Sequence, residues 1–118
     1  MEEPLYMPEG ALPPAEVRIE SLRAEPYPEG RRVRVLIVLT PFQKRPNLVV
    51  RIIDADGEEA AIVNVIEAMT HRMTFTMHLR GPINSSKFTL SVALQYEDLG
   101  TVHESSIPFD IIPEADGV

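Results

Sequence analysis

The chain has 118 residues, the size of one domain with one hydrophobic core. It contains no cysteine, which excludes disulfides, thiolate zinc sites, iron–sulfur clusters and cysteine nucleophiles. The formal net charge of −7 argues against a general binder of nucleic acid or of anionic membranes, while 44% hydrophobic and 25% charged residues are ordinary for a globular domain.

The first residues are rich in proline and glutamate and contain no basic residue before Arg18. We predict an extended segment over 1–15, a folded domain over 16–112 and a flexible polar tail over 113–118. The N-terminal sequence lacks the basic start and apolar run of a secretory signal. The longest apolar run, Val35 to Leu39, is far too short to cross a bilayer. We therefore expect a soluble, cytoplasmic protein without a membrane partner.

Short stretches rich in β-branched residues alternate with turn residues along the predicted domain. This pattern predicts β-strands. The first expected strand begins near residue 17. The other six cover residues 32–40, 48–53, 59–67, 72–80, 87–96 and 101–112. A helix over 60–70 is the competing interpretation, but its β-branched content and the turn before it favour a strand.

Several residues predict the turns and edges of this arrangement. Asp54 to Gly57 is expected to form a tight hairpin turn with Gly57 at positive φ. Residues 28–30, Pro-Glu-Gly, predict another turn. Pro108 confines its part of the last strand to a sheet edge or a bulge.

The clearest half-buried strand is the one over 72–80, where apolar residues alternate with threonine and histidine. We predict that Phe75 is a central core aromatic, so that its replacement by alanine costs about 3–5 kcal/mol.

Seven short strands in one small domain predict an all-β, seven-stranded antiparallel sandwich. In strand number and spacing, residues 16–112 resemble the immunoglobulin-like and fibronectin type III-like sandwiches. The cysteine pair and the tryptophan of immunoglobulin domains are absent, and Phe88, near the place of a tyrosine corner, has no hydroxyl group. The resemblance therefore implies an immunoglobulin-like fold and transfers no functional residue.

Basic residues are concentrated in the middle of the chain, because residues 31–53 carry six of them and no acid. One interpretation is that acidic neighbours neutralise these charges across adjacent strands. The other is that Lys44 and Arg45, in a loop bracketed by Pro41 and Pro46, meet an acidic partner. A nucleic-acid partner is disfavoured because aromatic stacking residues do not accompany the charges.

Three of the predicted strands are apolar on both faces, although only one face can point into the core. Leu36 and Val38 exceed the inward positions on one strand and Val49 on the next, and residues 60–66 are again apolar on both sides. Neighbouring side chains or the N-terminal segment could cover them, or they form a surface for a protein partner or for self-association.

The sequence offers only weak candidates for metal-binding or catalytic residues. Counted from Asp54, the acidic turn lacks the glycine and glutamate positions of an EF-hand. The three histidines, His71, His78 and His103, lack metal-ligand spacing, and His103 to Ser106 cannot form a relay on one strand. We therefore expect no catalytic residues, no metal and no cofactor.

The leading hypothesis is a non-enzymatic module for protein interaction or structure. The alternative is a small-molecule or carbohydrate-binding domain that uses end loops. For that role the chain offers four aromatic candidates, namely Phe42, Tyr27, Tyr6 and Tyr96.

Overall fold

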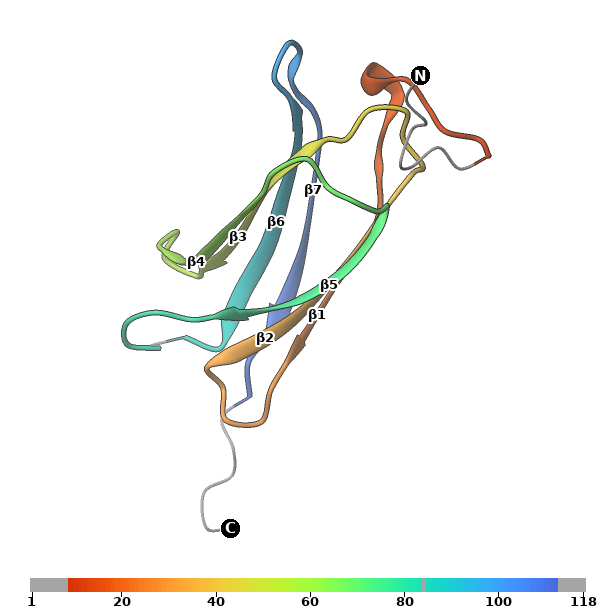
Figure 1. Cartoon of the computed structure of the whole chain (residues 1–118). Helices are drawn as coiled ribbons and strands as arrows, with labels where there is room; N and C mark the ends of the chain where they lie inside the picture. The colour runs from red at the N-terminus through yellow and green to blue at the C-terminus, as the bar shows by residue number, and fades with distance from the viewer. Residues whose placement is uncertain (1–8, 84, 113–118) are drawn as a thin grey trace.

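The computed structural model describes residues 9–83 and 85–112 and contains seven strands in two antiparallel sheets (Figure 1). A short 3-10 helix, η1 (Pro14–Glu16), precedes them. The strands are β1 (Ile19–Pro26), β2 (Arg32–Leu39), β3 (Asn47–Asp54), β4 (Glu59–Val65), β5 (Arg72–His78), β6 (Lys87–Tyr96) and β7 (Gly100–Asp110). The prediction of an all-β, seven-stranded antiparallel sandwich is confirmed.

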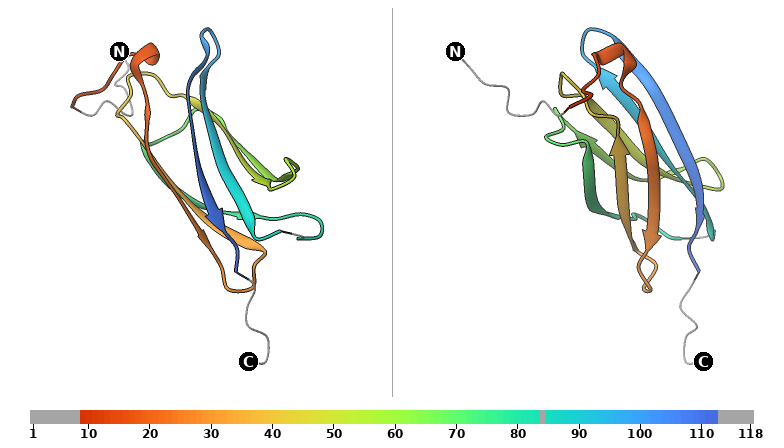
Figure 2. Two further views of the ribbon diagram at one scale, coloured as in Figure 1. Left: turned by 180° about the vertical axis from the view of Figure 1, so that it is seen from behind. Right: turned by 90° about the vertical axis from the view of Figure 1, so that its right-hand side faces the viewer.

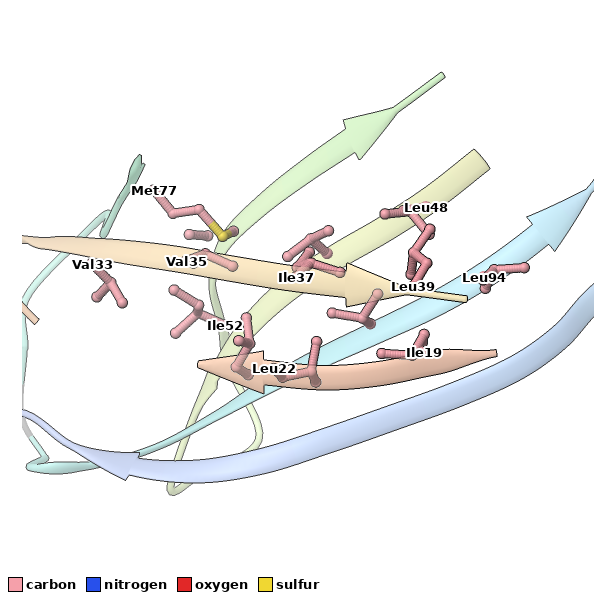
Figure 3. Close-up of a cluster of buried hydrophobic side chains, with 14 of the residues drawn as sticks. Ile19, Leu22, Val33, Val35, Ile37, Leu39, Leu48, Ile52, Met77 and Leu94 are labelled. Carbon is pink, nitrogen blue, oxygen red and sulfur yellow. The ribbon is translucent and has the colours of Figure 1, made fainter. Parts of the chain in front are cut away.

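The strands form one sheet in the order β1-β2-β5 and another in the order β4-β3-β6-β7. β2 and β6 lie inside their sheets, and each buries alternate residues against the other sheet. Figure 3 shows buried apolar side chains from both sheets, among them Val35 and Ile37 of β2 and Leu94 of β6. The core therefore follows from period-two alternation on these two inner strands.

The predicted turns are present. Between β3 and β4, Gly57 has a φ of 85°, and Asp54 Oδ1 accepts hydrogen bonds from the backbone N–H groups of Asp56 and Glu58, both at 2.9 Å. Between β1 and β2, the Gly30 N–H donates to the Tyr27 carbonyl at 2.9 Å. The aspartate and the glycines thus set where the chain reverses.

Phe75 is only half-buried, so the prediction of a central core aromatic at this position is wrong. Its side chain does face the core, because Phe75 pairs with the buried Val35. However, β5 is an edge strand, and Phe75 has a neighbouring strand on one side only. The buried aromatic residues are instead Phe42, in the loop after β2, and two residues of β6, Phe88 near its start and Tyr96 at its end, at 0%, 4% and 2% exposure.

Residues ahead of η1 lie against the loop between β2 and β3. The Leu12 N–H donates to the Pro41 carbonyl at 3.0 Å, and the Gln43 N–H donates to the Leu12 carbonyl at 2.9 Å. The Gln43 side chain adds a bond to the Ala11 carbonyl at 3.0 Å. This part of the predicted 1–15 segment is therefore held by the domain, whereas residues 1–8 and the predicted tail over 113–118 lie outside the described residues.

The edges β1 and β7 lie side by side and close one flank of the sandwich (Figure 2). His103 on β7 links them, because its Nδ1 atom accepts a hydrogen bond from the Ile19 N–H at 2.9 Å. Ile19 lies beside a β-bulge in β1, where its N–H points away from β2. The histidine therefore satisfies an edge amide and joins the two sheets.

We expect the replacement of His103 by alanine to lower the free energy of unfolding by about 1–3 kcal/mol, because it leaves the Ile19 amide without an acceptor. Urea unfolding of the variant and the wild type measures this loss. His103→Gln retains an acceptor and should recover part of the stability. Equal stability of wild type and alanine variant would contradict a linking role for His103.

Candidate interaction surfaces

Leu36 and Val38 lie on the outer face of β2, where both are half-buried. Leu36 is flanked by Arg23 on β1 and by Thr74 on β5, and Val38 is flanked in the same way by a serine and by Arg72. Arginine side chains cover apolar neighbours with their aliphatic parts while the guanidinium group stays in water. Residues of the same chain therefore flank this apolar pair, on the surface where partner contact was predicted.

Val49 lies on the outer face of the other sheet, where its cross-strand neighbours are Asn64 and Ala93. Next to it on β6 and β7, Ser91 lies opposite Ser106. We refer to Val49, Ser91, Ala93 and Ser106 as the Val49 face. All four side chains are small or medium-sized and uncharged, whereas arginine side chains flank Leu36 and Val38.

Charged groups border the Val49 face, and two of them neutralise each other. Arg51 Nε lies 3.2 Å from Glu59 Oε1, and Glu104 on β7 is the cross-strand neighbour of Ala93. The predicted neutralisation of basic residues is thus found at Arg51. It is also found at Arg32, which pairs with Glu29 at 2.7 Å, and this hydrogen bond holds the pKa of Glu29 below its ordinary value.

Lys44 and Arg45 lie in the loop between β2 and β3, at one end of the sandwich. Lys44 Nζ is 3.7 Å from Asp98 Oδ1 in the turn between β6 and β7. Tyr96 holds this loop, because its hydroxyl donates to the Lys44 carbonyl at 2.7 Å. Burial raises the pKa of Tyr96 to about 12. Among the residues that the structure describes, Arg45 has no carboxylate partner.

The residues predicted as interaction candidates therefore occupy three separate places. Leu36 and Val38 lie on one outer face, Val49 lies on the opposite outer face, and Lys44 and Arg45 lie at an end. The structure does not bring them together into one site.

The aromatic residues proposed for carbohydrate stacking offer little open ring surface. Phe42 and Tyr96 are buried, and the guanidinium carbon of Arg32 lies 4.2 Å from the centre of the Tyr27 ring. Tyr6 lies outside the described residues. A groove of about 460 Å³ between the turn at Gly30 and the end of β7 has no aromatic residue among its described lining.

Over residues 9–83 and 85–112, no three histidine, aspartate or glutamate side chains are placed to hold a metal ion. His103 is engaged with Ile19, and Glu104 pairs with Ala93 on the outward side of β7. No helix in the described part of the chain has the length and apolar character needed to cross a membrane.

From the sequence, residues 60–66 were predicted to be apolar on both faces, but the exposed flank formed by β4 and its connection to β5 was not predicted. Three of the five exposed large apolar side chains in the described part lie there, namely Ile62, Ile66 and Met69. The available signal was the run of uncharged residues from 60 to 66, which has no proline or glycine.

Comparison with known proteins finds no matching family model and no matching curated relative. Solved structures do match. A glycosyl hydrolase family 2 member from Bacteroides cellulosilyticus DSM 14838 has 16% identity and a TM-score of 0.57, over 80% of this chain and 15% of that chain. A β-glucuronidase from Ruminococcus gnavus, in complex with D-glucaro 1,5-lactone, has 14% identity and a TM-score of 0.54, over 81% and 16%.

A further β-glucuronidase from glycoside hydrolase family 2 has 17% identity and a TM-score of 0.53, over 80% of this chain and 12% of that chain. The chain thus spans less than a fifth of the length of each of these proteins. At these identities the likeness concerns the fold. The chain is an immunoglobulin-like β-sandwich similar to one part of these glycoside hydrolases.

Proposed function

We propose that this chain is a non-enzymatic β-sandwich module that packs another folded domain onto its Val49 face. The observation that carries the proposal is the character of this face. In a chain with a net charge of −7, the middle strands of the larger sheet place uncharged Val49 opposite uncharged Ala93 on the outside. Uncharged Ser91 lies next along β6, opposite Arg51, whose charge is paired with Glu59. Small side chains allow a second layer to approach at the spacing of about 10 Å that packed sheets adopt.

The structural matches support a role within a larger assembly. In the three matched structures, the part similar to this sandwich is 12–16% of the chain, so most of each protein lies outside it. A sandwich used in this way has neighbouring domains to contact. We therefore propose the same modular use for this chain, without sugar hydrolysis.

The size of the face favours a linked or weakly held domain over a free dimer. Four strands about 4.8 Å apart and roughly 18 Å long present about 350 Å² per partner. That is less than half of the roughly 800 Å² per partner in a standard stable complex. Interfaces between domains of one chain can be smaller, from about 600 Å² in total.

A photo-crosslinking amino acid at position 93, in the chain expressed in its own host, tests the proposal. We expect one defined crosslinked peptide, identified by mass spectrometry, and we expect it to disappear when Val49→Lys is added. The same probe at Thr74, on the outer face of the other sheet, is the matched control. An adduct from position 74 but not from position 93 would overturn the proposal.

Sedimentation velocity over a wide concentration range distinguishes binding of another domain from self-association of the chain. We expect the isolated chain to remain monomeric. A dimer that Ala93→Lys dissociates would show that this face binds a second copy of the chain instead.

A further inference from the structure

The edge strands of the two sheets differ in how well they are protected against pairing with another chain. β7 contains Pro108, and it lies against β1. β1 has a bulge after Ile19, carries charged residues and ends at Pro26. By contrast, residues 60–66, which include most of β4, contain no charge, no proline and no glycine. Bulges, charges and prolines are the usual protection of an edge strand. β4 has one bulge, at Ala60 near its start, and the rest of the strand lacks these features.

The hydrogen-bond pattern fixes which backbone groups of β4 are free. The Asp54 N–H donates to the Glu58 carbonyl at 2.9 Å, so alternate residues of β3 counted back from Asp54 direct their backbone groups toward β4. Val50 is one of them, and its partner Val63 returns these bonds. It follows that Ile62 and Asn64 direct their N–H and C=O groups away from the sheet.

The chain itself already uses the start of this edge. The Arg80 N–H, from the segment after β5, donates to the Ala60 carbonyl at 2.9 Å. Beyond Ala60, no hydrogen bond from outside the sheet reaches residues 61–65 within the part of the chain that the structure describes. Ala60, Ile62 and Asn64 therefore form a row of residues whose backbone groups point away from the sheet. The Ala60 carbonyl is already bonded, and the groups of Ile62 and Asn64 are open to pairing.

Apolar side chains accompany these free backbone groups. Ile62 is 36% exposed on β4, and Ile66 and Met69 are 71% and 62% exposed just after it. Figure 1 shows β4 at the side of its sheet opposite β7. An added strand would bond to the edge and cover part of this apolar surface at the same time.

The charged residues around β4 indicate which kind of segment binds to its edge. They also distinguish β4 from β5, the other edge strand on this flank. Exposed Asp56 and Glu58 precede β4, and exposed Glu67 follows it. β5 instead begins at Arg72 and ends at His78. We infer that the β4 edge is a strand-addition site for an extended polypeptide segment with an apolar, β-branched centre and basic residues at both ends. The inference rests on the proposed role as an interaction module but uses the backbone edge of β4, which borders the Val49 face, and not that face itself.

A synthetic peptide provides the direct test. Its centre alternates valine and threonine, it has lysines at both ends, and a fluorescent label reports binding through anisotropy. We expect saturable binding that weakens as salt is added. When glutamates replace the lysines, we expect the affinity to fall by at least about tenfold. Equal binding of the two peptides would overturn the charge selection, and no binding of either would overturn the site.

Backbone variants locate the site. Asn64→Pro removes an outward N–H without removing a bond of the β3–β4 ladder, and proline is tolerated at such edge positions. We expect it to weaken peptide binding about tenfold or more, whereas Asn64→Thr keeps the amide and should bind as the wild type does. The matched control is Thr74→Pro on the edge of β5, which should leave binding unchanged. Loss of binding in the β5 variant alone would overturn the assignment to β4.

If Asn64→Pro fails to fold, hydrogen exchange of the wild-type chain locates the peptide site instead. On peptide binding, the amides of Ile62 and Asn64 should become protected, and protection elsewhere without these two would overturn the inference. Peptide binding should survive Ala93→Lys, so failure of the Val49 face and failure of the β4 edge are distinguishable. A dimer that forms through β4, is dissociated by Asn64→Pro and excludes the peptide would identify a second copy as the occupant and overturn the inference.

Discussion

Replacing Phe42 by alanine is expected to lower the free energy of unfolding by about 3–5 kcal/mol, one of the largest single losses that this domain offers. Phe42 has no exposed surface and lies where residues 11–12, the loop after β2 and the core meet. Removing the ring leaves a cavity that the surrounding strands can fill only in part. Chemical denaturation monitored by circular dichroism measures the loss.

Phe75→Ala is the matched comparison, because it removes the same ring from the edge strand β5. Phe75 is half-buried, so we expect a loss of about 1.5–2.5 kcal/mol, roughly half of the cost at a fully buried ring. A larger loss at Phe75 than at Phe42 would contradict the assignment of Phe42 to the core and of Phe75 to its edge.

Tyr96 is expected to make the stability of the domain fall at alkaline pH. Burial raises the pKa of its hydroxyl to about 12, whereas in the unfolded chain the pKa is about 10. Its contribution is therefore complete below about pH 10 and is lost as the pH rises toward 12, because the unfolded chain releases the proton first. The expected decline is about 1.4 kcal/mol per pH unit in this interval.

Tyr96→Phe isolates this effect from the other groups that titrate at high pH. At neutral pH the variant should be less stable by about 1 kcal/mol, because it lacks the hydrogen bond to the Lys44 carbonyl. Between pH 10 and 12 the stability difference between wild type and variant should shrink and then reverse. A difference that stays constant with pH would mean that the Tyr96 hydroxyl titrates normally in the folded state.

The sequence by itself determined the strands, the turns and most of the core. Val33, Val35, Ile37 and Leu39 alternate on one strand and are buried, and Gly57 has the positive φ that its turn requires. These properties depend on local periodicity and backbone preference, which are written in neighbouring residues.

Only the tertiary structure decided which strand stands at an edge and what covers each apolar face. Phe75 fits the pattern of a core residue, yet it is half-buried because β5 has one neighbour. His103 accepts a hydrogen bond from Ile19, 84 positions away, which no local pattern predicts. The open edge of β4 depends on the same fact: sheet order is set by pairing between distant segments, so the free backbone groups of Ile62 and Asn64 become visible only when all seven strands are in place.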